Sequence, residues 1–77
     1  MRPTDIRVGA TYANRTGTRT RTVLAIGDKY HPEWYRDQRC PRGNPGLEFR
    51  AGNGAVNRVY LSSFARWASK EVLVRVG

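Results

Sequence analysis

The sequence predicts a small, mainly β domain with five short strands and one short helix before the last of them. Three observations lead to this prediction. The chain has 77 residues, which suffice for one compact domain and leave no room for a cleft between two. Several short segments alternate polar and apolar residues, and turns rich in Asn and Gly separate them. One helical spacing of apolar residues stands just before the last apolar segment.

A first hairpin is predicted near the N-terminus. Residues Ile6–Ala13 carry apolar side chains at alternate positions, as a half-buried strand does, and Gly9 marks a bend in it. Asn14–Gly17 has the composition of a turn. The strand Thr18–Ile26 follows and is the strongest in the chain, because it is rich in β-branched residues. Strict alternation would divide its side chains between two faces, one with Thr20, Thr22, Leu24 and Ile26 and the other with Arg19, Arg21, Val23 and Ala25.

A long loop at about residues 28–45 separates this hairpin from a second one. It contains three prolines and shows no periodic pattern. Loops longer than about 12 to 15 residues are usually functional or disordered, and the aromatic residues of this loop argue against full disorder. The second hairpin then joins a strand at Leu47–Arg50 to one at Ala55–Leu61 through a turn at Gly52–Gly54.

A short helix and a last strand complete the predicted order. Ser62 and Ser63 are candidate N-caps, and Leu61 is placed to staple the helix down. Phe64, Trp67 and Ala68 share one helical face, which indicates core residues rather than a surface platform for stacking. The apolar residues of the last strand are Val72, Leu73, Val74 and Val76.

This order of elements resembles that of an SH3-like five-stranded barrel, in which a short helical turn precedes the final strand. Closure into a barrel would protect edge strands that an open sheet exposes to aggregation. An open antiparallel sheet carrying one helix is the alternative architecture. No linker or repeat divides the chain, so residues 1–77 are expected to form one domain.

The charge of the chain indicates a polyanionic partner. Fourteen basic residues oppose six acidic ones, which gives a formal charge of +8 and an isoelectric point near 10.8. Twelve of the fourteen are Arg, whose planar guanidinium binds phosphate through two hydrogen bonds and stacks on aromatic rings or bases. The alternative is that the excess charge only keeps a small domain soluble.

The first candidate site is a basic stripe on the second predicted strand. Arg19 and Arg21 share a face of that strand, Arg15 leads into it, and Arg7 is expected to approach from the neighbouring strand. Such a stripe suits a phosphate backbone. A merely solvated strand face is the alternative interpretation.

The second candidate site is the long loop, where aromatic residues alternate with cations. Bases stack on such rings, and protein interfaces also favour Trp, Tyr and Arg. A loop that folds its rings onto its own domain is the third possibility. The cations expected to contact nucleic acid are Lys29, Arg36 and Arg39, and the residues expected to contact a partner of either class are Tyr30, His31, Trp34, Tyr35 and Arg42.

The residue inventory favours neither catalysis nor a cofactor. The chain has one His, one Cys and six scattered carboxylates. Zinc usually takes four protein ligands, or three and water, so His31 and Cys40 alone fall short, and a zinc site would need Glu33 and Asp37 of the same loop to join them. The glycines do not stand between a strand and a helix N-terminus, as a phosphate-binding loop requires. We therefore expect no catalytic residue, no metal and no cofactor.

Cysteine use and hydropathy suggest where the protein works. Cys40 is the only cysteine, so no intramolecular disulfide can form, and a reducing cytoplasm is the simpler setting. No run approaches the roughly 18 apolar residues of a membrane span, and residues 1–8 lack the apolar core of a signal peptide.

The two ends of the chain resemble small uncharacterised phage and prophage proteins. The residues that carry this resemblance, over about half the chain, are Gly9, Tyr12, Arg15, Gly17, Arg21 and Val23, with Leu61, Phe64, Trp67 and Ala68 near the other end. These are mostly turn and core positions. The resemblance therefore implies a fold and a mobile-element origin, with the host-cell cytoplasm as the setting, more than an activity.

Together these features predict a non-catalytic binding protein of phage type. The leading hypothesis is binding of nucleic acid, DNA or RNA, through the arginine strand face and the aromatic loop. The alternative is a phage-encoded adaptor or inhibitor that binds a host protein or ribonucleoprotein, in a defence complex (as anti-CRISPR proteins do) or a gene-expression complex. The sequence does not predict an oligomeric state.

Overall fold

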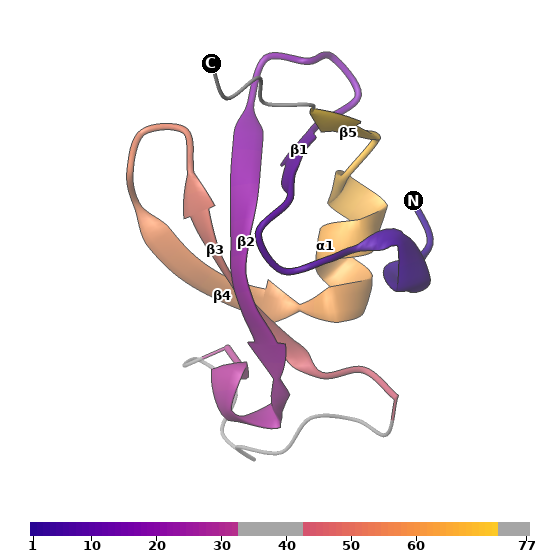
Figure 1. The fold of residues 1–77 in the computed structure, drawn as a ribbon, viewed down its shortest axis with the longest axis vertical. Coiled ribbons are helices and arrows are strands. Elements are labelled where there is room, and N and C mark those ends of the chain that lie inside the picture. The colour runs from indigo at the N-terminus through magenta and orange to yellow at the C-terminus, as the bar shows by residue number, and fades with distance from the viewer. Residues whose placement is uncertain (33–42, 73–77) are drawn as a thin grey trace.

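The fold is a five-stranded antiparallel sheet with one short helix against it (Figure 1). A computed structural model describes residues 1–32 and 43–72. In chain order the elements are the 3-10 helix η1 (Pro3–Asp5), β1 (Thr11–Ala13), β2 (Thr20–Gly27), the 3-10 helix η2 (Asp28–Tyr30), β3 (Gly46–Ala51), β4 (Val56–Tyr60), α1 (Leu61–Trp67) and β5 (Lys70–Val72).

The sheet has the strand order β4-β3-β2-β1-β5, and every neighbouring pair is antiparallel. The mainly β class, the five strands and the helix before the last strand are therefore confirmed. The sheet is open: within residues 1–32 and 43–72, the edge strands β4 and β5 are not paired with each other. A closed barrel is not confirmed, and the open sheet with one helix is the architecture observed.

The first predicted strand is much shorter than expected. Of the predicted strand Ile6–Ala13, only Thr11–Ala13 forms β1. The segment before it, Pro3–Asp5, is helical. Proline favours the first turn of a helix, and Asp5 accepts a hydrogen bond from the Arg2 backbone nitrogen at 3.3 Å. Gly9, with φ of 88°, reverses the chain between the two elements, so the prediction of a bend there is confirmed.

A β-bulge changes the predicted faces of β2. Val23 pairs with Phe49 and Ala25 with Glu48, so Leu24 is an extra residue on β2. Past the bulge, Ile26 pairs with the buried Leu47 and packs against the core. The expected alternation is therefore wrong beyond Val23, because Ile26 joins the face that Val23 occupies.

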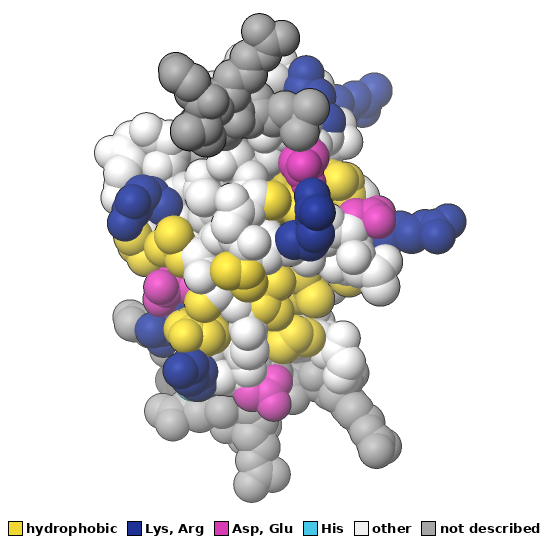
Figure 2. Space-filling view, in the orientation of Figure 1, with side chains coloured by type: hydrophobic (Ala, Val, Ile, Leu, Met, Phe, Trp, Pro, Cys, Tyr) yellow, Lys and Arg dark blue, Asp and Glu magenta, His cyan; other side chains and the backbone are white. Residues whose placement is uncertain are grey.

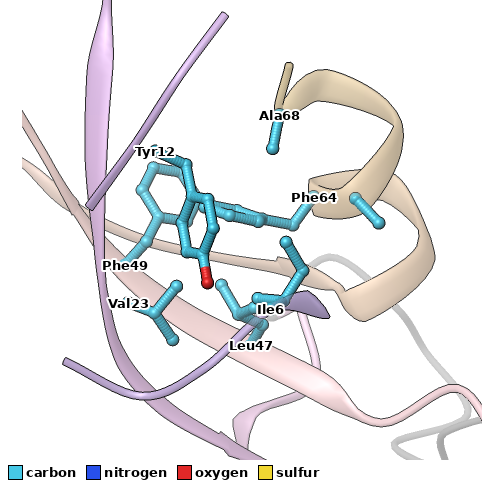
Figure 3. Packing of buried hydrophobic residues seen from close by; sticks show 8 residues of the cluster. Ile6, Tyr12, Val23, Leu47, Phe49, Phe64 and Ala68 are labelled. Atoms are coloured by element: carbon cyan, nitrogen blue, oxygen red, sulfur yellow. The ribbon is translucent and has the colours of Figure 1, made fainter. Parts of the chain in front are cut away.

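The core lies between one face of the sheet and α1. Phe64 is fully buried at the centre of this core. Its ring centroid lies 5.7 Å from that of Tyr12, 5.8 Å from that of Phe49 and 5.5 Å from that of Trp67. Figure 3 shows the rings of Tyr12, Phe49 and Phe64 meeting above Ile6, Val23 and Leu47. Edge-to-face and tilted ring pairs of this kind contribute beyond their buried area. The prediction that Phe64 belongs to the core is confirmed.

The start of α1 is capped from a distance. Ser62 and Ser63 lie inside the helix, so their predicted role as N-caps is wrong. The side chain of Asn44 instead accepts a hydrogen bond from the Ser62 backbone nitrogen at 2.9 Å. A side-chain oxygen at that position satisfies one of the free N–H groups of the first turn.

Gly46, the first residue of β3, fixes where the end of η2 lies. A Cβ atom at Gly46 would collide with the backbone of Tyr30 and His31. Only glycine allows the two segments to approach so closely. Tyr30 and His31, which follow β2, are thereby held against the start of β3 at one end of the longest axis (Figure 1).

Candidate functional site

Arg19 and Arg21 of the predicted stripe lie on the face of the sheet against which α1 packs. They stand at the start of β2, beside the tip of the β3–β4 hairpin. Arg21 pairs with Tyr12 on one side and with Ala51 on the other, and Tyr12 is fully buried in the core. Arg19 lies two residues earlier, where its backbone nitrogen donates to the Asn14 side chain at 3.2 Å. Arg19 stands one residue before β2, and it lines the same hollow as Arg21, so both arginines lie on one side, as predicted.

Within residues 1–32 and 43–72, the Arg21 guanidinium contacts aromatic rings and no carboxylate. Its Cζ atom lies 4.5 Å from the ring centroid of Phe49 and 4.2 Å from that of Trp67. Partial burial is the main cause that lowers the pKa of Arg21, and the charge of Arg19 lowers it further. A cation so placed gains from the faces of the rings, and no carboxylate among the described residues neutralises its charge.

A hollow of about 560 Å³ opens beside the two arginines. The tip of the β3–β4 hairpin forms one wall, and the start of β2 forms the other. The backbone nitrogen of Gly52 donates to the Thr20 carbonyl at 3.0 Å and holds the two walls together. The lining residues are Thr18, Arg19, Thr20, Arg21, Phe49, Ala51, Gly52, Asn53, Ala55 and Asn57.

Two amide side chains complete the polar lining of the hollow. The Asn53 side-chain oxygen accepts a hydrogen bond from the Ala55 backbone nitrogen at 3.0 Å, which leaves the amide nitrogen to donate. Asn57 pairs with Phe49 across the sheet and is exposed, and no hydrogen bond of its side chain is found within the described residues. The hollow therefore offers both donors and acceptors beside the cationic groups.

A second, shallower depression of about 310 Å³ lies on α1, lined by Ser63, Arg66 and Trp67. The Trp67 ring contacts Arg21 and also lines this depression, so it connects the helix surface to the arginine pair. Trp67 is partly buried and packs against the core, as predicted, but it is also part of the surface.

The other two arginines of the predicted stripe, Arg7 and Arg15, do not line the hollow beside this pair. Arg7 lies in the turn before β1, and its guanidinium forms an ion pair with Glu71 of β5 at 2.7 Å. The hydrogen bond and the charge of Glu71 raise the pKa of Arg7. Arg15 is exposed in the loop between β1 and β2. The structure thus brings Arg19 and Arg21 together and gives Arg7 a carboxylate partner.

The described part of the aromatic loop folds back onto the sheet. The ring of Tyr30 is partly buried, with Lys29 Nζ at 5.1 Å and Arg58 Cζ at 5.6 Å from its centroid. His31 Nδ1 lies 3.2 Å from the Pro32 carbonyl oxygen, and Pro32 is buried. The remaining predicted loop residues fall outside the described residues: Trp34, Tyr35, Arg36, Arg39 and Arg42.

The described residues of the second predicted site, residues 29–31, lie away from Arg19 and Arg21. In Figure 1, η2 lies at the bottom of the long axis, whereas the loop between β1 and β2 lies at the top. Figure 2 shows Lys and Arg side chains at several separate places around one face, with hydrophobic side chains gathered towards its middle. Some of these cations are neutralised by neighbours, as in the 3.1 Å ion pair of Arg58 with Glu48.

The described residues hold no group of three or more His, Cys, Asp or Glu side chains that could bind a metal ion. Cys40, Glu33 and Asp37, which we considered as ligands beside His31, lie outside these residues. No helix in the described ranges has the length and apolar character needed to cross a membrane.

Sequence reasoning missed four residues of the site: Asn53, Asn57, Arg66 and Trp67. Asn53 was assigned to turn chemistry and Trp67 to the core, and each also faces a hollow. One signal was available. Asn57 is a polar residue at an inward position of a predicted strand, and such a residue indicates that the inner face is not fully covered.

The comparisons with known proteins give no relative from which a role could be transferred. No protein-family model, no curated protein and no solved structure matches the chain.

Proposed function

We propose that this protein binds nucleic acid without catalysis, through the surface formed by Arg19, Arg21 and the adjoining hollow. The observation that carries the proposal is a pair of neighbouring guanidinium groups for which the described residues supply no carboxylate partner. Two like charges held side by side favour an external anion, and the fork of each guanidinium matches a phosphate group. The overall charge of +8 adds long-range attraction for the same class of partner.

An arginine pair binds phosphate more favourably when the free protein already holds one of its side chains in place. Arg21 is oriented by Phe49 and Trp67, so less conformational entropy is lost when it binds. Arg19 is exposed and free to adjust to the ligand. One fixed cation and one adaptable cation form a suitable contact for a chain of phosphates.

Fluorescence anisotropy of labelled oligonucleotides at low and physiological salt tests this proposal. The informative variant is Arg19→Gln, which removes one exposed charge and no packing contact. Arg50→Gln is the matched control, because Arg50 is also exposed but lies on the opposite face of the sheet, paired with Thr22. We expect Arg19→Gln to weaken binding clearly more than Arg50→Gln does. Equal losses would show that only net charge matters.

The second candidate function is protein binding, and the Trp67 depression favours it. Trp and Arg dominate the energetics of protein interfaces, and Arg66 and Trp67 line the same surface. The partner would be a host protein or ribonucleoprotein, in a defence or gene-expression complex. If no oligonucleotide binds at low salt, a pull-down with wild type and Arg66→Gln is the next experiment.

Three broader expectations belong to the proposal as well. The order of strands and the helix before β5 support an SH3-like relationship, with the sheet as its open form. The resemblance of both chain ends to phage and prophage proteins supports a mobile-element origin. The single cysteine supports a working place in the cytoplasm of the host cell.

A further inference from the structure

We propose that the hollow beside Arg19 and Arg21 receives one unstacked base, so that the preferred ligand is a single strand of nucleic acid and not a duplex. This inference rests on the proposed function, since it specifies the class of nucleic acid that the same surface recognises. It depends on three observations: the spacing of the arginines, the shape of the hollow and the chemistry of its lining.

The spacing of the two cations suits an extended strand. Arg21 lies in β2 and Arg19 stands one residue before its start, so an extended chain separates their α carbons by about 7 Å at most. Successive phosphates of an extended single strand lie at a comparable distance. A strand that runs along β2 therefore places one phosphate at each guanidinium and directs the base between them towards the hairpin side, where the hollow opens.

The hollow has the volume of a ligand pocket. Its volume of about 560 Å³ falls within the usual range for pockets that hold small organic molecules, about 300–1,000 Å³. A base in a duplex is stacked and paired, and it cannot enter such a space without being extruded. A base of a single strand has no such restriction, which favours the single strand.

The lining of the hollow fits a base in particular. Asn57 offers an amide donor and acceptor, and Asn53 offers an amide donor, which are the groups that hydrogen-bond to base edges. The guanidinium of Arg21 lines the same space, and its N–H groups can donate at the edge of the hollow while Phe49 and Trp67 contact it. Phe49 and Ala51 supply apolar surface between these polar groups.

The other described cations compete poorly for this role. The guanidinium groups of Arg7 and Arg58 are paired with carboxylates at 2.7 and 3.1 Å. Lys29 lies over the ring of Tyr30 at the far end of the molecule. Among the residues described, the combination of two neighbouring arginines, free amides and a hollow occurs at the β3–β4 hairpin.

Three labelled probes with equal numbers of phosphates test the inference: a mixed-sequence single strand, a wholly abasic single strand and a duplex. We expect the base-containing strand to bind at least about tenfold more tightly than the abasic strand, which is the effect of losing one stacked base. Asn57→Ala should weaken binding of the base-containing strand and leave the abasic strand unchanged. Val56→Ala is the control, because Val56 is the exposed neighbour on the other face of β4.

The outcomes separate this inference from the proposed function. Equal affinity for the abasic and base-containing strands overturns the base-binding hollow and leaves phosphate binding intact. Tighter binding of the duplex than of either single strand does the same. A preference for bases that Asn57→Ala leaves unchanged also overturns it, because the base then binds elsewhere. If none of the three probes binds at low salt, the proposed function itself is wrong.

Discussion

At the scale of residues, two aromatic rings hold the side chain of Arg21 in place without neutralising its charge. Phe49 and Trp67 hold the guanidinium by their ring faces, while Arg19 repels it and burial removes water from it. Both effects disfavour the charged form, as the lowered pKa of Arg21 reflects. A protein that retains such an arrangement gives up some stability in its free form and recovers it when an anion binds.

This arrangement predicts that removing Arg19 trades affinity for stability. Arg19→Gln relieves a repulsion between like charges and should raise the free energy of unfolding by roughly 0.2–1 kcal/mol, the size typical of exposed charge pairs. Urea denaturation at low ionic strength measures this change, and Arg50→Gln is the control. A clear loss of stability in Arg19→Gln would contradict the proposed repulsion.

Phe64 should be the most sensitive position of the core. Its ring is fully buried and is in contact with the rings of Tyr12, Phe49 and Trp67. Phe64→Ala should cost about 3–5 kcal/mol, which a domain of this size hardly tolerates. Phe64→Leu keeps most of the volume and should remain folded. A thermal melt of both variants checks the difference, and similar melting temperatures for the two would argue against this packing.

At the scale of elements, features of the fold that local sequence patterns determine were predictable. Features that contacts between distant residues determine were not. The alternation of β2 and the turn residues around Gly17 and Gly54 are local signals, and both hairpins were predicted from them. The bulge at Leu24 depends on how β3 pairs with β2, and no local pattern contains it. The cap of α1 comes from Asn44, which lies 18 residues from Ser62 in sequence, so serines at the start of the helix misled the prediction.

The junction between η2 and β3 provides a test at this scale. Gly46→Ala places a Cβ against the backbone of Tyr30 and His31 and should destabilise the fold by more than about 1–3 kcal/mol, the usual cost of overpacking. Gly17→Ala is the control, because it places its Cβ in open space and strains only a positive φ of 73°. Chemical denaturation compares the two. An equal loss in both variants would show that the backbone approach at Gly46 is not tight.

At the scale of the whole molecule, the loop between β1 and β2, which leads to Arg19, and the 3-10 helix η2, which contains Tyr30, lie at opposite ends of the long axis (Figure 1). The excess of arginine predicted a polyanion-binding surface, and the spacing of Arg19 and Arg21 predicted correctly that the two lie together. The hollow could not be predicted, because it depends on how the β3–β4 hairpin lies beside the start of β2. The amides of Asn53 and Asn57 become site residues only through that geometry.

The salt dependence of binding tests the central claim most directly. The affinity of wild type, Arg19→Gln and Arg50→Gln for one single-stranded oligonucleotide is measured at several salt concentrations. If Arg19 contacts a phosphate, Arg19→Gln should reduce the slope of log affinity against log salt by about 0.7, the release per contact in a single strand. Arg50→Gln should leave the slope close to that of wild type. A slope that falls equally in both variants, or in neither, would contradict the claim that this pair of arginines is the binding surface.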